Sequence, residues 1–485
     1  MTKKIEILPN TRLEGHGKIE IFLDDKGNVQ DGYFQVIEFR GFEKFCEGRH
    51  VEELPRITPK ICGVCPGAHH MASSKACDAV YKVEIPDTAR KLREIFYNAH
   101  IAHSHILHFF ALGAPDLILM NEDPAKRNIF GLVAVVGRDI GIAVVDNRGY
   151  AQRIQEIIGG NPTYPVSSLP GGLSKSLDEK DRIEIQKMAK SLVEFSKKSL
   201  DIFDTLVLKD KRLVDIIAND LYRRETYYAG IVDNKNRVNF YDGRIKVVDP
   251  QGKKVCTFEA SDYLNYIAEH VEPWSYIKFP YIKSIGWKGF VEGVNSGIYR
   301  VNSLARLNVA DGMATPFAQE AYEKLYSFFG KKPVHNILAY HWARLIELMY
   351  ACERILELIN DSTITDTHVR NLPTDEPSEG VGVVEAPRGT LYHHYITDKR
   401  GIVQKVNLIV ATVQNNAAIN MSVKKVAQKL IKNGAVDDTL LNMVEMAVRA
   451  YDPCLACASH ALPGRMPLEV RIYQGGGLYK RIVRA

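Results

Sequence analysis

Residues 58–70 read TPKICGVCPGAHH and residues 451–460 read YDPCLACASH, so each of these two stretches contains one Cys-x-x-Cys pair. The first cysteines of the two pairs, Cys62 and Cys454, are 392 positions apart (454 − 62). Four thiolates in two close pairs can bind a soft or borderline transition metal. Only a fold that brings the end of the chain back to its beginning could join the pairs. If the two pairs meet, the protein is one folded unit built around one buried metal centre.

The composition is that of a soluble globular protein and argues against several other classes. The chain has 485 residues, of which 46% are hydrophobic and 25% charged, enough for a large core. A net charge of +5 from 63 basic and 58 acidic residues, without a long basic tract, does not indicate a nucleic-acid partner. The start MTKKIEILPN lacks the apolar stretch of a secretory signal, and the most apolar segments are broken by charges before they reach membrane-spanning length. With eight cysteines and no export signal, we expect reduced thiols in a cytoplasmic protein.

The sequence patterns predict a single large α+β domain over residues 1–460, dominated by long helices. Alternating apolar residues predict N-terminal strands over about residues 1–60. Apolar residues at three- and four-residue spacing predict a helical body over about 66–225. A strand-rich insertion at about 225–300 and a remainder of helices and peripheral antiparallel strands complete the prediction. No Gly-, Ser- or Pro-rich linker divides the chain, which favours one domain.

A single Cys-x-x-Cys pair has simpler interpretations than a catalytic metal site. One is half of a structural zinc site, and the other is a thioredoxin-like redox pair. The redox interpretation is weakened because the first pair does not lie in a strand-to-helix unit of the thioredoxin type. The zinc interpretation is weakened because zinc ribbons keep their two pairs within tens of residues of each other.

Further motifs surround the two cysteine pairs. In chain order they are Arg12-Leu-Glu-Gly-His16, Arg40-Gly-Phe-Glu-Lys44, Lys60-Ile-Cys-Gly-Val-Cys-x-x-x-His69, Glu385-Ala-Pro-Arg-Gly389 and Asp452-Pro-Cys-x-x-Cys-x-x-His460. This set, in this order, resembles the large subunit of nickel–iron hydrogenases. The resemblance runs from residue 12 to the C-terminus and is closest to the cytoplasmic branch, in particular the methyl-viologen-reducing, deazaflavin-non-reducing hydrogenases that work with heterodisulfide reductase.

The resemblance implies a nickel–iron centre held by the four cysteines. All four would bind nickel, with Cys62 and Cys454 as terminal ligands, while Cys65 and Cys457 would also bridge to iron. In this family the iron also carries carbon monoxide and cyanide ligands. His69 would donate an N–H to a bridging thiolate and tune its electron density.

Other residues are assigned by the resemblance to the surroundings of the metals. Arg388 would lie above the open metal position and polarise dihydrogen, and an ion pair with Asp116 would fix it there. Thr412 would donate a hydrogen bond to an iron cyanide, and Pro387 would also border the cofactor. His16 is expected to be structural.

The resemblance further implies a third metal and a processed C-terminus. Glu43, His460 and the backbone carbonyl of Leu408 would bind Mg²⁺ or Fe²⁺ near the C-terminal end. Residues 461–485 would be an extension that a maturation endopeptidase removes after nickel is inserted. Within that extension, LEVRIY and LYKRIV predict a hairpin around Gly475-Gly476-Gly477.

The reaction implied by the resemblance is reversible heterolysis of dihydrogen. Cys454 sulfur would take the proton, and Glu14 would pass it toward solvent. The remaining cysteines have no cluster spacing, so the electrons must leave through a small subunit that carries iron–sulfur clusters. Further electron-transfer subunits are expected, of the heterodisulfide-reductase type or a diaphorase.

Several alternatives share some or all of these motifs. The catalytic subunit of a bidirectional NAD-reducing hydrogenase or of a deazaflavin-reducing hydrogenase would carry the same residues, and only the partner subunits would differ. A non-catalytic subunit like that of respiratory complex I lacks the cysteines, which argues against that class. A zinc-binding structural protein is a third possibility, and metal analysis would separate it from a hydrogenase.

Overall fold

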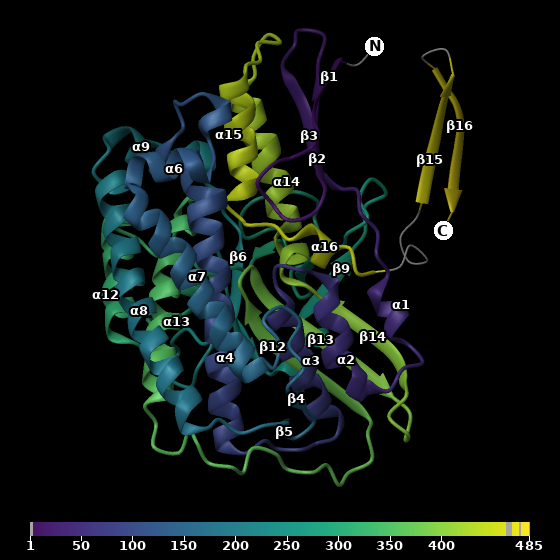
Figure 1. The fold of residues 1–485 in the computed structure, drawn as a ribbon. Coiled ribbons are helices and arrows are strands. Elements are labelled where there is room, and N and C mark those ends of the chain that lie inside the picture. Colours follow the sequence, from purple (N-terminus) through teal and green to yellow (C-terminus); the bar gives the residue numbers. More distant parts are fainter. Residues whose placement is uncertain (1–2, 462–467, 475–476, 485) are drawn as a thin grey trace.

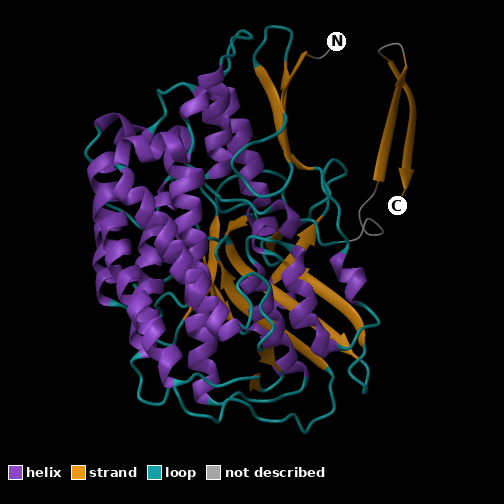
Figure 2. Cartoon of the chain, viewed as in Figure 1, coloured by secondary structure: helices purple, strands orange, loops and turns teal. Residues whose placement is uncertain are grey.

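The computed structural model describes residues 3–461, 468–474 and 477–484. A layer of long helices packs beside a group of small sheets (Figure 1, Figure 2). The helices are α1 Phe42–Cys46, α2 Leu54–Ile57, α3 Pro66–Val80, α4 Asp87–Leu107, α5 Ala114–Ile118, α6 Ile129–Val136, α7 Arg138–Gly159, α8 Glu179–Phe203, α9 Lys211–Ala218, α10 Tyr263–Tyr266, α11 Ser303–Val309, α12 Pro316–Phe329, α13 Ala339–Ile359, α14 Ala411–Leu430, α15 Asp438–Arg449 and α16 Leu455–Ala458.

The strands form several small sheets rather than one large one. The main sheets have the strand orders β1-β2-β3, β11-β6-β7-β8 and β12-β13-β14, and all their pairs are antiparallel except β11 with β6. The strands are β1 Lys3–Ile7, β2 Gly17–Leu23, β3 Val29–Val36, β4 Ser168–Leu169, β5 Gly172–Leu173, β6 Tyr227–Val232, β7 Arg244–Val248, β8 Lys254–Phe258, β9 Ile267–His270, β10 Phe279–Ile282, β11 Tyr299–Arg300, β12 Glu379–Ala386, β13 Gly389–Thr397, β14 Val403–Ile409, β15 Leu468–Gln474 and β16 Gly477–Arg484.

The centre of the helical layer is α13. Every residue of this helix from Ala339 to Cys352 is buried, because α4, α8 and α12 cover it on different sides. A helix that is enclosed all round belongs to the core of a large protein rather than to its surface. The outer helix α7 has one face buried against α4 and α8 and the other exposed.

The helix that follows the first cysteine pair packs directly on the β12–β13 hairpin. Gly380 and Gly382 of β12 face α3 so closely that an added Cβ would lie 2.3 Å from the nitrogen of Val80 and 2.0 Å from the carbonyl oxygen of Ala72. Any larger residue would push the helix away from the strand. These two glycines therefore fix the position of α3, and with it that of the first cysteine pair, against the hairpin.

The two ends of the domain meet through backbone hydrogen bonds. Residues 451–460 follow α14 and α15 and run beside the loop before β2, where Leu455 N–H donates to Glu14 O at 3.1 Å. Further along, Arg40 N–H donates to Ser459 O at 3.0 Å. The C-terminal cysteine motif is thereby held between the N-terminal sheet and α1, as joining the two pairs requires.

The structure confirms the predicted fold class, an α+β unit dominated by long helices with peripheral antiparallel sheets. The sequence of residues 380–413 has the pattern of consecutive strands, but β14 stops at Ile409 and α14 begins at Ala411. Strands β15 and β16 form the predicted hairpin, while Gly475 and Gly476 of its turn lie outside the described residues. Among the described residues, no helix is long and apolar enough to cross a membrane.

Buried neutral histidines predict a loss of stability in acid. Burial lowers the pKa of His70 to about 4 and that of His335 to about 3. Below about pH 6.5 the unfolded chain takes up a proton at each of these positions, whereas the folded chain does not until the pH falls to about 4 at His70 and to about 3 at His335. The free energy of unfolding therefore falls as the pH drops from about 6.5 to 4, by on the order of 3 kcal/mol per histidine. We expect His335→Gln to flatten the decline of melting temperature with falling pH, and an unchanged slope would contradict this account.

Candidate metal centre

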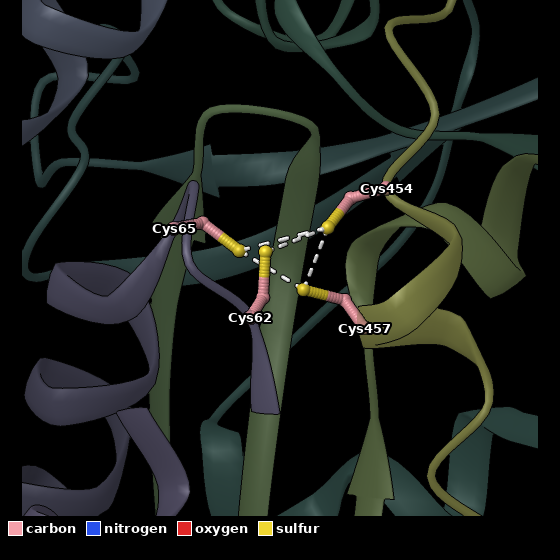
Figure 3. A group of neighbouring side chains, drawn as sticks. All are labelled: Cys62, Cys65, Cys454 and Cys457. Atoms are coloured by element: carbon pink, nitrogen blue, oxygen red, sulfur yellow. Dashed lines mark hydrogen bonds between the residues drawn. The ribbon is translucent and has the colours of Figure 1, made fainter. Parts of the chain in front are cut away.

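The four cysteines of the two motifs meet in one buried cluster (Figure 3). The Sγ–Sγ distances are 3.2 Å for Cys62–Cys454, 3.0 Å for Cys65–Cys457 and 2.8 Å for Cys454–Cys457. All four sulfurs lie within 4.8 Å of one another, and none is in a disulfide. The predicted meeting of the two pairs is thus present, although their sequence separation is 392.

Local helix geometry sets the direction of each pair. Cys65 is the N-cap of α3 and Pro66 is its first residue, a position where proline is favoured because its missing N–H needs no partner. The N–H of Val64 donates to Cys62 Sγ at 3.2 Å and turns the loop around that sulfur. In the second pair, Cys454 precedes the single turn of α16 and Cys457 lies within it.

The pKa values of the cysteine thiols are consistent with a site that binds a cation. Hydrogen bonds from the neighbouring cysteines lower the pKa of Cys62 well below its ordinary value, whereas burial raises the pKa of Cys454 and Cys457 well above theirs. Without a cation, one thiolate is favoured and the others stay protonated. A bound metal ion deprotonates its thiol ligands outright. Four soft sulfur donors that converge in this way fit nickel and iron.

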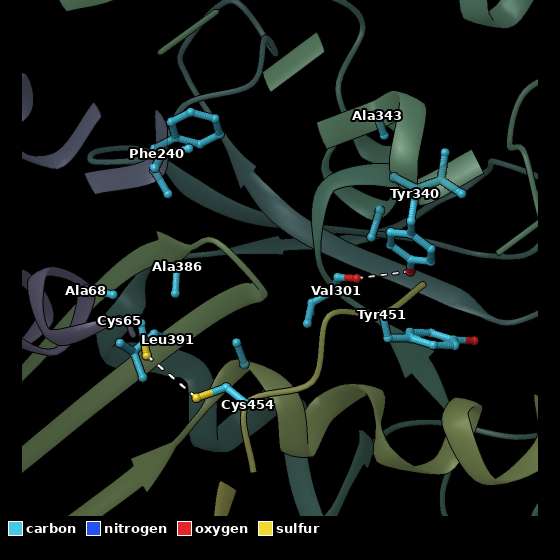
Figure 4. Close-up of a cluster of buried hydrophobic side chains, with 14 of the residues drawn as sticks. Cys65, Ala68, Phe240, Val301, Tyr340, Ala343, Ala386, Leu391, Tyr451 and Cys454 are labelled. Atoms are coloured by element: carbon cyan, nitrogen blue, oxygen red, sulfur yellow. Dashed lines mark hydrogen bonds between the residues drawn. The ribbon is translucent and has the colours of Figure 1, made fainter. Parts of the chain in front are cut away.

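The surroundings of the sulfurs are apolar on one side. Ala68, Ala386 and Leu391 lie near Cys65 and are buried (Figure 4). Their side chains carry no donors or acceptors, so they exclude water from that side of the cluster. A dry site strengthens the electrostatic interactions of the charged groups that remain.

Glu14 lies beside the second cysteine pair, as its motif predicts. Cys454 Sγ donates a hydrogen bond to Glu14 Oε2 at 3.0 Å, and Ala456 N–H donates to the same oxygen at 3.1 Å. Burial raises the pKa of the Glu14 carboxyl. Glu14 itself is only partly buried, so it lies between the buried cluster and the surface.

The predicted ion pair between Asp116 and Arg388 is wrong. Arg388 instead donates from Nε to the carbonyl oxygen of Asp452 at 2.9 Å and from Nη2 to Asp452 Oδ1 at 3.1 Å. Asp116 pairs with Arg12 and, at 2.9 Å, with Arg449. The physical reason is that Asp452 lies just before Cys454 in the chain. The segment that carries the second cysteine pair therefore places a backbone acceptor and a side-chain acceptor beside Arg388.

Arg388 is held at the tip of the β12–β13 hairpin, whose two loop residues are Pro387 and Arg388. Gly389 follows with φ +131°, and an added Cβ there would lie 2.1 Å from a methyl group of Val301. Only glycine fits this conformation and this close approach. Nη1 of Arg388 also lies 3.4 Å from Ser104 Oγ on α4.

A buried ion cluster beneath the hairpin tip was not found by sequence reasoning. Arg306 contacts Glu347 at 2.5 and 2.6 Å and Glu385 at 2.8 Å, and it also donates to the carbonyl oxygens of Ala386 and Pro387. A fully buried charged side chain needs an oppositely charged or hydrogen-bonding partner, and each member of this cluster has one. Glu385 carried a signal as part of a quoted motif, but Arg306 and Glu347 lie in ordinary helical sequence.

His69 and Thr412 both contact the cysteine motifs. His69 Nε2 lies 3.4 Å from Cys457 Sγ, and its Nδ1 lies 3.1 Å from Nε2 of His393. Burial lowers the pKa of His69 to about 4, so the imidazole is neutral. Thr412 Oγ1 accepts the Cys454 N–H at 3.0 Å from the first turn of α14.

Glu43, His460 and Leu408 also come together. The N–H of Leu408 donates to Glu43 Oε1 at 2.9 Å, and His460 Nε2 lies 3.7 Å from the same oxygen. This buried nitrogen has no hydrogen-bond partner among the described residues, while burial lowers the pKa of His460 to about 4. A neutral imidazole with an open nitrogen beside a carboxylate fits a metal ion.

The sequence matches a known family over most of its length. Residues 40–126 and 232–460 match the nickel-dependent hydrogenase family, and residues 4–39 match the HoxL-like family. The iron-sulfur subunit of the F420-non-reducing hydrogenase of Archaeoglobus profundus is 51% identical, with 99% of both chains covered. A subunit of the vhc F420-non-reducing hydrogenase of Methanococcus voltae is 44% identical over 99% of this chain and 100% of the relative. The beta subunit of the NAD-reducing hydrogenase HoxS of Cupriavidus necator is 36% identical over 98% of each.

Solved structures agree with these matches. A chain of an NAD+-reducing [NiFe]-hydrogenase in its H2-reduced state superposes with a TM-score of 0.88 at 36% identity, covering 95% of this chain and 100% of the other. A chain of the Ni-Fe-Se hydrogenase of Desulfovibrio vulgaris Hildenborough superposes with a TM-score of 0.73 at 22% identity, covering 95% and 100%, and shares the fold.

Proposed function

The chain belongs to the nickel-dependent hydrogenases as a nickel–iron large subunit of the F420-non-reducing type, and we propose that it cleaves dihydrogen heterolytically and reversibly. One observation carries this proposal. The thiol of Cys454, inside the four-sulfur cluster, donates to the carboxylate of Glu14 at 3.0 Å. A metal ligand that can hold a proton therefore touches a group that can accept it.

Two residues of the chain take up the proton in turn. Nickel and iron, held by the four thiolates, would supply the Lewis acidity that makes dihydrogen a cleavable acid and would take up the electron pair of the broken bond. Cys454 sulfur takes the proton, and Glu14 Oε2 accepts it along the existing hydrogen bond. Cys62, Cys65, Cys454 and Cys457 would together hold the nickel and the iron through their sulfurs. Carbon monoxide and cyanide would be the remaining ligands of the iron, and Thr412 and Pro387 would lie beside them.

Arg388 is proposed to polarise dihydrogen beside the cluster, and Asp452 to hold its guanidinium in place. We expect Arg388→Lys to lower the rate of dihydrogen uptake about 10²-fold, the loss typical of misplacing a group by about 1 Å. Lysine has a single nitrogen and cannot reach both acceptors of Asp452 at once. Nickel content should stay unchanged, and Arg400→Lys, a change at an arginine whose side chain is 81% exposed, serves as the control. A wild-type rate in the Arg388 variant would remove this role.

The third metal and the processed tail are further proposals. Mg²⁺ or Fe²⁺ would be bound by Glu43, His460 and the carbonyl oxygen of Leu408. A maturation endopeptidase would then remove residues 461–485, so that active enzyme ends at His460. Intact-mass measurement of the active enzyme tests this, and a chain that still ends at Ala485 would contradict it.

The electrons need a partner, and the names of the relatives as subunits of larger enzymes support a small subunit. We propose that this small subunit carries iron–sulfur clusters and that heterodisulfide-reductase-type subunits follow in a cytoplasmic complex. An NAD-reducing hydrogenase is the second candidate, because a relative and a structure of that type are each 36% identical to the chain. Identification of the co-purifying chains separates the two, since a diaphorase supports the second candidate.

The experiment that tests the proposed reaction uses the purified complex. We expect about one nickel per chain together with iron, and formation of HD from dihydrogen in D2O. The exchange reports heterolysis at the metals whether or not electrons reach an acceptor. Zinc as the sole metal at the thiolates, or nickel-loaded enzyme without exchange, would refute the proposal.

A further inference from the structure

Arg388 and Asp452 lie on two segments that are far apart in the chain. They are separated by 64 positions and are joined by the hydrogen bonds from Nε and Nη2 of Arg388 to Asp452. Pro387 directly precedes the arginine, and Tyr451 directly precedes the aspartate. Whatever holds the backbone of these two preceding residues therefore also sets how the guanidinium meets its partner.

The first turn of α11 contacts both segments. Asn302, the N-cap of this helix, donates from Nδ2 to the carbonyl oxygen of Tyr451 at 2.6 Å. Arg306 donates from Nη1 to the carbonyl oxygen of Ala386 at 2.9 Å and from Nη2 to that of Pro387 at 3.3 Å. Residues four positions apart lie on the same side of a helix. One side of one helical turn therefore holds the hairpin tip and the segment that leads to the second cysteine pair.

The residue before this N-cap is also tied to the hairpin tip. The side-chain amide of Asn415 accepts the Val301 N–H at 2.9 Å and donates to the carbonyl oxygen of Arg388 at 3.2 Å. The carbonyl oxygen of Val301 accepts a hydrogen bond from the Tyr340 hydroxyl at 3.1 Å (Figure 4). The start of α11 and the hairpin tip are thus connected through the backbone as well as through side chains.

Both polar side chains of this turn are fixed in place. Asn302 is fully buried and has φ of +90°, a strained conformation that persists where the surroundings impose it and that is typical of functional sites. Its Oδ1 accepts the Ser303 N–H at 2.7 Å, so both ends of the amide are used. Arg306 is held by Glu347 at 2.5 and 2.6 Å, and His105 lies 2.9 Å from the same carboxylate. Side chains locked in this way can hold their neighbours in one geometry.

We propose that Asn302 and Arg306 are positioning residues for Arg388. Through the backbone that they hold, they keep its guanidinium against Asp452 and beside the four sulfurs. This inference rests on the proposed function, in which that guanidinium polarises dihydrogen. Buried carbonyl groups need donors throughout a protein, so hydrogen bonds alone would not distinguish this turn. It is distinguished because two of the accepting carbonyls directly precede the arginine and its aspartate, and one rigid turn supplies both donors.

Asn302→Asp in the assembled holoenzyme tests the proposal. An ionised aspartate keeps an oxygen for the Ser303 N–H but has no hydrogen to donate to Tyr451. We expect dihydrogen uptake and HD formation to fall about 10–100-fold, the loss typical of outer partners at a metal site, with nickel content unchanged. A wild-type rate in the folded, nickel-loaded variant would overturn the proposal. Loss of nickel would also overturn it, because Asn302 would then serve assembly of the site instead.

Asn308→Asp is the matched control on the same helix. Asn308 is buried, donates from Nδ2 to the carbonyl oxygen of Val334 at 2.9 Å and accepts the Val334 N–H at 3.0 Å. The substitution removes the same kind of hydrogen bond, but this bond does not lead to Arg388. The rate should stay at the wild-type level. Equal losses in the two variants would mean that any such change damages α11, and the proposal would fail.

A double-mutant cycle with Arg388→Lys separates positioning from a general structural effect. If Asn302 acts through Arg388, adding Asn302→Asp to the lysine variant should lower its rate by no more than about twofold. The losses from two independent changes multiply instead, and a combined loss equal to that product would contradict the proposal. Arg306→Lys is read in the same way, and if that variant does not fold, the Asn302 variant decides.

Hydrogen exchange measured by mass spectrometry gives a readout that does not depend on dihydrogen. The N–H groups of Asp452 and Cys454 are hydrogen-bonded at 2.9 and 3.0 Å within the held segment. Asn302→Asp should speed their exchange about fivefold, the effect of one lost hydrogen bond on local opening, whereas Asn308→Asp should not. Unchanged exchange in Asn302→Asp would refute the positioning role. If the wild-type complex formed no HD, the proposed reaction would fail, while the exchange would still show whether Asn302 holds this segment.

Discussion

Cys65→Ser is expected to remove nickel from the purified chain and to abolish dihydrogen uptake. Cys65 Sγ lies 3.0 Å from Cys457 Sγ and 3.9 Å from Cys454 Sγ, so it is close to both sulfurs of the second pair. A serine hydroxyl stays protonated near neutral pH and is a hard donor, so it does not replace a thiolate on nickel. The loss should far exceed the roughly 10–100-fold that follows removal of an outer partner of a metal ligand. Nickel analysis and dye-coupled uptake measure both effects.

Cys77→Ser is the matched control for that substitution. Cys77 is also buried, lies on α3, the helix that Cys65 precedes as N-cap, and donates through Sγ to the carbonyl oxygen of Val51 at 3.2 Å. Serine can make the same hydrogen bond, so the variant should keep its nickel and most of its activity. Equal nickel loss in both variants would mean that α3 does not tolerate the exchange, and the ligand role of Cys65 would then need independent evidence.

The places of the four cysteines and of Glu14 could be predicted because they lie in short motifs that resemble those of nickel–iron hydrogenases. Two residues between cysteines place both sulfurs at one helix start, and the motif around Glu14 indicates its place beside Cys454, where the structure has it. The partner of Arg388 cannot be read in this way. Asp452 and Asp116 are both acidic residues in motif-like contexts, and the path of the chain decides between them.

Close packing is the second part that the sequence does not reveal. Gly380 and Gly382 look like ordinary strand glycines, yet their lack of a side chain sets the distance between β12 and α3. Thr412 falls in a run whose pattern predicts a strand, but it lies in the first turn of α14 and accepts a hydrogen bond from the Cys454 N–H. Both features depend on which element lies opposite, and local propensity contains no information about that.

Glu14→Gln is expected to lower dihydrogen uptake by about 10²–10⁴-fold, the contribution typical of a positioned acid–base group. The amide oxygen can still accept hydrogen bonds from Cys454 Sγ and Ala456 N–H, so the loop should keep its shape. It cannot take up a proton, and a proton left on Cys454 sulfur has no exit along this path. Nickel content should be unchanged, which separates this loss from that of a ligand.

The contrast between two isotope measurements locates the defect in Glu14→Gln. Interconversion of ortho- and para-dihydrogen needs cleavage and recombination within the site, whereas HD formation in D2O also needs the proton to exchange with solvent. We expect the first to continue and the second to fall with uptake. Glu38→Gln is the control, because Glu38 is a neighbouring carboxylate that pairs with His16 instead of a cysteine. If HD formation survived in Glu14→Gln, protons would leave by another route, and the hydrogen bond from Cys454 to Glu14 would serve structure alone.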